Sequence, residues 1–280
     1  MCTCNEPNSK AMDDPLSLSA SHEQNRRTWD EMVKARQGFT RPARDEDFVD
    51  PLKTVDGIGW LGGDVRGKEL LCLAAGGGRQ SALYAAAGAK VVVVDISPAM
   101  LELDRLVGAE RNLDIQTVQA SMDNLFMFAA DRFDIVVQPV STCYVPSIEK
   151  VYREVARILR PHGLYISQHK QPTSLQADIT SRTGGYALLE PYYREGPLPQ
   201  VVGSRHREPG TLEYLHRWEE LIGGLCRQGF VIEDLIEPFH ANPHAEPNSF
   251  GHRSQYVAPY VRIKARRMAT RNAGLVIPRS

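Results

Sequence analysis

The sequence has few of the features typical of secreted proteins, membrane proteins or proteins that bind nucleic acid. Its 280 residues include five cysteines, an odd number without the spacing of a disulfide framework. No apolar run approaches the roughly 20 residues that cross a bilayer. The first residues, "MCTCNEPNSKAMDD", lack the apolar core of a secretory signal. With a net charge of -1, nothing global attracts nucleic acid or an anionic membrane. These absences predict a soluble cytoplasmic protein with no nucleic-acid or membrane partner.

The composition is that of a globular chain, with 42% hydrophobic and 24% charged residues. We expect flexible tails at 1–20 and 268–280, flanking one domain at 21–267. The C-terminal tail is basic, but it has no aromatic residues with which to stack on bases. The sequence shows no internal repeat. It is compatible with a homodimer.

Strand-like and helix-like segments alternate through most of this domain. The runs "ELLCLAA" (69–75) and "KVVVVDI" (90–96) are continuously apolar, which is typical of strands buried on both faces. Further strands are predicted at 115–120, 133–140, 164–170, 230–238 and 260–266. Helices are predicted at 21–37, 80–88, from Ser97-Pro98 onward, 146–163 and 211–229. The order predicts an α/β fold: a Rossmann-like, doubly wound, mostly parallel seven-stranded sheet with helices on both faces and an antiparallel last strand. Segment 171–210 lacks periodicity, and we interpret it as a substrate cap inserted after the fifth strand.

Two features at the ends of the first two strands suggest a nucleoside-containing cofactor. Gly76–Gly78 follow the first strand, where glycines let backbone N–H groups approach a ligand. Asp95 ends the second strand, where a carboxylate can accept hydrogen bonds from both ribose hydroxyls. The spacing of the glycines alone is also compatible with a nicotinamide dinucleotide as cofactor. The dinucleotide-binding fingerprint is G-x-G-x-x-G, and Ser81 is small enough for its third glycine position. An NAD(P)-dependent oxidoreductase is therefore an alternative at this point.

The order of several weak motifs carries a resemblance. The stretches "LLCLAAGGG", "VVVVDIS", "VQASMDNL", "RFDIVV", "ILRPHGLYI" and "YLHRWEELIGGLCRQGFVIEDLIEP" together resemble a class I S-adenosylmethionine (SAM)-dependent methyltransferase of the small-molecule type. The resemblance implies SAM as cofactor and a small organic methyl acceptor as partner. Carried over position by position, it implies cofactor contacts at Ala74, Gly76, Gly78, Asp95, Ile96, Ser121, Met122 and Gln138.

Three positions depart from the family pattern. Cys72 replaces an acidic residue that often organises the glycine loop, Ala74 replaces the first glycine, and Ser121 replaces an aspartate. Ala74 is expected to fit if its φ is negative. The departures make a non-catalytic SAM-binding protein a further alternative.

Methyl transfer needs positioning more than a universal catalytic residue. His169, just past the fifth strand, and Tyr144, after the fourth, are the candidates for a base or a contact with the sulfonium. Trp29, Tyr192, Tyr193 and His206 are candidates for the substrate site. The Asn/Asp-Pro-Pro-Tyr signature is absent after the fourth strand, which disfavours methylation of planar amides or base amines and leaves O-, S-, C- or aliphatic N-methylation. The histidines in 240–252 match only half of a zinc pattern, so no metal is predicted.

Overall fold

The computed structural model describes residues 19–182, 184–201 and 206–269. Most of both predicted tails, with Cys2 and Cys4, lies outside these residues. The α-helices are α1 (Ala20–Lys34), α2 (Pro51–Val55), α3 (Gln80–Ala86), α4 (Pro98–Arg111), α5 (Ile148–Ile158), α6 (Pro172–Gln176), α7 (Gly224–Arg227) and α8 (Phe250–Arg253). Short 3₁₀ turns are η1 (Gly38–Thr40), η2 (Asp45–Phe48) and η3 (Thr142–Tyr144), and a π-helical turn, η4 (Glu219–Gly223), precedes α7.

The strands form one sheet of seven in the order β3-β2-β1-β4-β5-β7-β6. Their bounds are β1 (Glu69–Leu73), β2 (Lys90–Asp95), β3 (Ile115–Gln119), β4 (Phe133–Gln138), β5 (Leu159–Lys170), β6 (Phe230–Ile236) and β7 (Tyr260–Arg267). Strands β1 to β5 pair in parallel, whereas β7 runs antiparallel between β5 and β6. The predicted fold class, with its antiparallel last strand, is confirmed.

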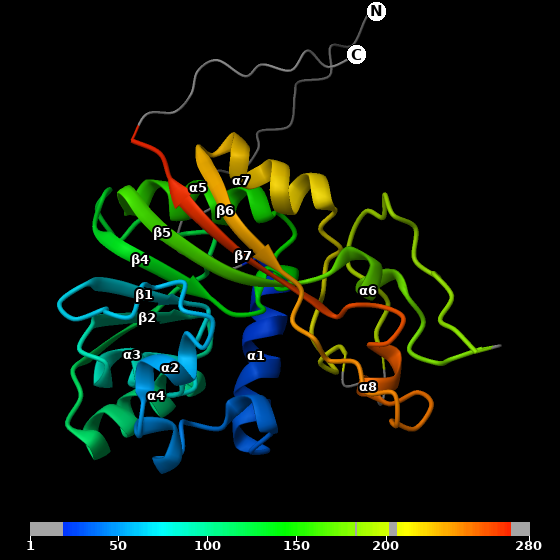
Figure 1. Cartoon of the computed structure of the whole chain (residues 1–280), viewed down its shortest axis with the longest axis horizontal. Helices are drawn as coiled ribbons and strands as arrows, with labels where there is room; N and C mark the ends of the chain where they lie inside the picture. Colours follow the sequence, from blue (N-terminus) through cyan, green and yellow to red (C-terminus); the bar gives the residue numbers. More distant parts are fainter. Residues whose placement is uncertain (1–18, 183, 202–205, 270–280) are drawn as a thin grey trace, which may run out of the picture.

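Helices cover both faces of the sheet (Figure 1). Helices α5 and α7 lie on one face, and α2, α3 and α4 lie on the other. The segments around α6 and α8 extend beyond one end of the sheet, with α1 beside them. No helix among the described residues is both long and apolar enough to cross a membrane.

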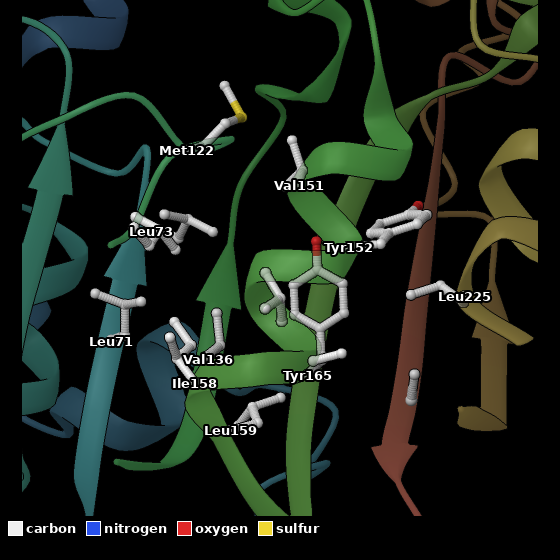
Figure 2. Close-up of a cluster of buried hydrophobic side chains, with 14 of the residues drawn as sticks. Leu71, Leu73, Met122, Val136, Val151, Tyr152, Ile158, Leu159, Tyr165 and Leu225 are labelled. Atoms are coloured by element: carbon white, nitrogen blue, oxygen red, sulfur yellow. The ribbon is translucent and has the colours of Figure 1, made fainter. Parts of the chain in front are cut away.

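Apolar side chains fill the space between the sheet and its helices on each face. Figure 2 shows the larger cluster, in which Leu71, Val136 and Tyr165 of the strands meet Val151 and Tyr152 of α5. A second cluster on the opposite face includes Leu70 and Cys72 of β1. The two clusters explain why β1 and β2 have no alternating polar positions: these strands are buried on both sides.

The predicted helix 146–163 ends earlier than expected. Helix α5 stops at Ile158, and Leu159 already pairs with Phe133 of β4. Pro161 lacks a backbone donor and disfavours helical geometry in the residue before it, so the chain changes to strand at once. The register then shifts before Ile135 pairs with Leu164, which leaves Pro161–Gly163 as an irregularity within β5.

The predicted helix 211–229 is wrong over its first seven residues. Residues 211–217 are irregular, and the helical turns begin at Trp218. Long-range hydrogen bonds hold this segment: the Leu212 N–H donates to Asn25 Oδ1 at 2.7 Å, and the Tyr214 N–H donates to the Cys143 carbonyl at 2.7 Å. Tertiary partners satisfy backbone groups that would otherwise be bonded within a helix.

Candidate cofactor and acceptor site

A cavity of about 490 Å³ lies at the carboxyl ends of the parallel strands. The strand order reverses between β1 and β4, and such a switch point is where doubly wound sheets bind ligands. One end of the cavity is lined by Gly76, Asp95 and Ser121, and the other by Gln168 and Arg262. We call these the cofactor end and the acceptor end.

The chain makes a tight bend after β1. Ala74 has a φ of 48°, Gly77 of 115° and Gly78 of 71°. Ala74 therefore does not meet the condition of a negative φ: this alanine adopts the left-handed conformation that glycine takes more readily. A Cβ on Gly76 would lie 2.8 Å from Met100 Cβ and 3.0 Å from Asp95 Oδ2, so this position has no room for a side chain.

Asp95 lies beside this bend, at the end of β2. Its Oδ2 accepts a hydrogen bond from the Gly76 N–H at 2.9 Å, and its Oδ1 accepts one from the Ser97 N–H at 2.9 Å. Burial raises the pKa of Asp95 to about 6, against the opposing effect of these two hydrogen bonds. The carboxylate lines the cavity and thus joins the bend to the cavity wall.

A second carboxylate holds the bend from behind, and it comes from α4. Asp104 is fully buried and accepts hydrogen bonds from the N–H groups of Gly77 (2.9 Å) and Gly78 (3.0 Å), and from the Ser81 hydroxyl. It does for this loop what the acid missing at Cys72 was expected to do. Sequence reasoning missed this residue, although Asp104 falls on the buried stripe of α4 with Leu101 and Val107, where an acid is unusual.

All but one of the other predicted cofactor residues line the cavity. Ala74, Ile96, Ser121, Met122 and Gln138 line the cavity, whereas Gly78 does not. A Cβ on Gly78 would lie 2.9 Å from the Leu103 carbonyl oxygen, so this glycine allows α4 to approach the bend. The Gln138 side chain is tied to its neighbours, accepting a hydrogen bond from Tyr165 and donating one to Ser141. Their cofactor contacts remain predictions.

Tyr144 and Trp29 both line the cavity, and their rings meet edge to face at 5.7 Å. The Tyr144 hydroxyl donates to Glu208 Oε2 at 2.7 Å, and burial raises the pKa of Tyr144 well above its ordinary value. Lys170 Nζ also donates to Glu208 Oε2, at 2.7 Å, and contacts Glu213 Oε2 at 3.1 Å. Burial opposes the charge on Glu208, but the charge and hydrogen bond of Lys170, together with hydrogen bonds from the Tyr144 hydroxyl and the backbone, outweigh it and lower the pKa of Glu208.

His169 is not positioned as a base. His169 belongs to β5, and its buried ring does not line the cavity. Nδ1 is 2.8 Å from the Thr142 hydroxyl, and Nε2 is 2.7 Å from the Ser167 hydroxyl. Burial lowers the pKa of His169 to about 3, so the ring is neutral and has both nitrogens engaged. The histidine is therefore a satisfied interior residue.

Three predicted substrate residues also lie outside the cavity lining: Tyr192, Tyr193 and His206. Tyr192 and Tyr193 contact each other edge to face, and Tyr193 is largely exposed. His206 stacks on Phe250 at 4.9 Å, and burial lowers its pKa to about 3. Within the described residues, no three metal-binding side chains gather at one point.

Sequence reasoning also did not identify several side chains that line the rest of the cavity. Asn25 of α1 donates to the carbonyls of Tyr144 (3.0 Å) and Leu212 (3.1 Å), which fastens this helix over the cavity. Glu208, Gln168 and Arg262 reach the lining from segments far apart in the chain. No local pattern predicts them, because long-range packing alone brings them together.

A nucleoside-binding α/β fold of the methyltransferase type is thus defined by the sheet order and the cofactor end. A family model described as a methyltransferase domain matches residues 71–167. The chain is 31% identical over 228 residues to an uncharacterised methyltransferase, YbaJ, of Bacillus subtilis, covering 76% of this chain and 89% of that protein. It is also 40% identical over 203 residues to a demethylmenaquinone methyltransferase of Clavibacter sepedonicus (65% and 78% covered).

Solved structures agree on the fold. A SAM-dependent methyltransferase of Mesorhizobium loti matches with a TM-score of 0.59 at 21% identity, over 73% of this chain and 93% of that one. A geranyl diphosphate C-methyltransferase of Streptomyces coelicolor matches with a TM-score of 0.60 at 14% identity, over 89% and 99%. The chain belongs to the class I SAM-dependent methyltransferase family, and SAM is its cofactor. Family membership favours this class over the nicotinamide-dependent alternative.

Proposed function

We propose that the protein transfers a methyl group from SAM to a small organic acceptor bound at the acceptor end of the cavity. The observation that carries this proposal is the continuity of one cavity from Asp95 to Arg262. The glycine bend and the Asp95 carboxylate suit the adenosyl part of the cofactor, and the remaining space suits a small molecule rather than a polymer.

The residues present fit the cofactor. Asp95 lies where a carboxylate can accept the ribose hydroxyls, and the absence of a Cβ at Gly76 keeps the bend close to it. Gln80 also lines this cavity, and its buried Oε1 has no hydrogen-bond partner among the described residues. A buried amide oxygen of this kind favours a ligand that donates a hydrogen bond.

Bound SAM would supply an electrophilic methyl group. The acceptor would give an electron pair to the methyl carbon, the electron pair of the broken carbon–sulfur bond would leave on sulfur, and any acceptor proton would go to solvent or a base. The chain's part is to hold the acceptor in line with that methyl and to exclude water. The wall formed by Trp29 and Tyr144 serves both purposes.

Isothermal titration with SAM and with S-adenosylhomocysteine tests the proposal. Wild-type protein is expected to bind both, and Asp95→Ala is expected to lose at least about tenfold in affinity, because charge-assisted hydrogen bonds disappear. Asp114→Ala, which removes an exposed acid before β3, is the matched control. Equal binding by Asp95→Ala and wild type would remove the role given to Asp95.

Turnover is tested separately. Transfer of labelled methyl from SAM to members of a small-molecule acceptor panel would support the enzymatic activity. SAM binding with no transfer to any acceptor class would favour the non-catalytic alternative.

A further inference from the structure

Arg262 differs from the other cations around the cavity. Its side chain lies on β7 at the acceptor end, and its Nε donates to Gln168 Oε1 at 2.6 Å. Within residues 19–182, 184–201 and 206–269, no carboxylate forms an ion pair with this guanidinium. By contrast, Arg79 also lines the cavity but is paired with Asp47 at 2.6 Å. A half-buried guanidinium without a counter-ion is costly, so the position favours an anionic ligand.

Gln168 strengthens this preference. It lies opposite Arg262 in the register of β5 and β7, and its amide oxygen is engaged by Arg262 Nε. Its amide NH₂ group has no acceptor among the described residues. Together with the two terminal guanidinium nitrogens of Arg262, this amide makes a set of donors that suits a carboxylate, which accepts hydrogen bonds on two oxygens.

The lining near these donors is mainly apolar, and the carboxylates that also line the cavity there are already engaged: Asp56 accepts hydrogen bonds from the Trp60 and Leu61 N–H groups, and Glu208 accepts them from Tyr144 and Lys170. Ile166 of β5, Tyr260 of β7 and Trp60 before β1 line the same end of the cavity. The next cation on β7, Lys264, is occupied by Glu233 at 3.2 Å. One unpaired positive charge within apolar walls matches a monoanion on an apolar body better than a phosphate dianion, which would remain half neutralised.

Several strands separate the donors of Arg262 and Gln168 from the cofactor end. Asp95 lies on β2 and Arg262 on β7, and in the order β2-β1-β4-β5-β7 four strand spacings separate them, about 19 Å in all. The cofactor end occupies the ends of β2 and β1. An acceptor anchored at Arg262 would therefore extend back over β5 and β4 toward the cofactor.

Resting on the proposed function, we propose that the methyl acceptor is a small monocarboxylate with an apolar or aromatic body, held through its carboxylate by Arg262 and Gln168. The carboxylate is the anchor, and the atom that receives the methyl lies nearer the cofactor end.

Calorimetry with defined probes tests this proposal without needing turnover. Benzoate and hexanoate are titrated into the full-length protein, with and without saturating S-adenosylhomocysteine, alongside the neutral benzamide and hexanamide. Wild-type protein is expected to prefer each carboxylate to its amide by about tenfold or more, because hydrogen bonds to the charged group are lost in the amide. Arg262→Gln is expected to abolish this preference, and Arg262→Lys to retain part of it as a charge without a planar fork.

Lys264→Gln is the matched control, since it removes a cation from the same face of β7 outside the cavity lining. It is expected to keep the wild-type preference. Equal affinity for acids and amides, undiminished acid binding by Arg262→Gln, or no binding of either acid by wild type would overturn the proposal. Failure to bind S-adenosylhomocysteine would instead count against the proposed function, and the titrations without it keep the two outcomes apart.

Discussion

The two ends of the cavity are built in different ways. The cofactor end is assembled from strand ends that lie close in sequence, between Ala74 and Met122, and its glycine bend is held through backbone N–H groups. The acceptor end collects single side chains from β5, β7 and the segment before Trp218, including Gln168, Glu208 and Arg262. A site made of local backbone geometry can be recognised in a sequence, whereas a site made of distant side chains must wait for the fold.

The sharpest way to break the cofactor end is to fill its bend. Gly76→Ala adds a Cβ that would lie 2.8 Å from Met100 Cβ and 3.0 Å from Asp95 Oδ2, so α4 and the carboxylate must both shift. We expect a loss of S-adenosylhomocysteine affinity of about 100-fold and a stability cost of about 1–3 kcal/mol, the usual range for overpacking. Titration calorimetry and denaturant unfolding measure the two effects.

Gly185→Ala is the control, because a Cβ there meets nothing within 4 Å. It is expected to leave both quantities near wild type. Tight binding by Gly76→Ala would mean that the bend yields more easily than its contacts suggest.

The next largest effect is expected at the carboxylate behind the bend. Asp104→Ala leaves the N–H groups of Gly77 and Gly78 without their acceptor in the interior, at a cost of about 2–4 kcal/mol. Cofactor affinity should fall as well, because the bend loses its support. Glu102→Ala, on the exposed side of α4, is the control for helix propensity and net charge. A stable Asp104→Ala protein with unchanged affinity would show that the bend holds itself.

The same contrast explains what could be predicted from sequence. The parallel sheet was predictable because the valines of β2 and the apolar run of β1 have one simple explanation, burial on both faces. The position of Asp95 followed from where β2 ends. Residues 211–217 could not be predicted, since their helix-like pattern is overridden by bonds to Asn25 and Cys143. The prediction of His169 as a base failed because the sequence does not tell which face of a strand lines the cavity.

The pH dependence of stability gives a finer test of the cofactor end. The pKa of Asp95 is raised by burial from 3.8 to about 6, so the folded state holds this proton more tightly than the unfolded state. The stabilisation is complete below about pH 4 and is lost as the pH rises to about 6. Asp95→Asn has no proton to lose there. Relative to that variant, wild type should lose about 1–3 kcal/mol of unfolding free energy across this window.

Denaturant unfolding of both proteins from pH 4 to pH 7 measures the difference, with Asp104 present in each so that its own titration largely cancels. Parallel curves would show that Asp95 is better solvated than its burial implies. With cofactor added, wild-type affinity should instead fall as the pH drops through about 6, since the ionised carboxylate is the better hydrogen-bond acceptor for ribose hydroxyls.

The smallest effect is expected between the two ends, at Tyr144, and it sharpens the comparison most. Tyr144→Phe removes one hydroxyl, whose hydrogen bond to Glu208 contributes about 0.5–1.5 kcal/mol, while Lys170 keeps Glu208 paired and the ring still meets Trp29. Tyr152→Phe is the matched control, because its buried hydroxyl donates to the Leu221 carbonyl away from the cavity. Both variants should lose similar stability and keep their affinity for S-adenosylhomocysteine. Only Tyr144→Phe should change the affinity for acceptor-like carboxylates, because Tyr144 lines the space between the two ends. If Tyr144→Phe weakened the cofactor instead, the boundary between the two ends would have to be moved past this residue.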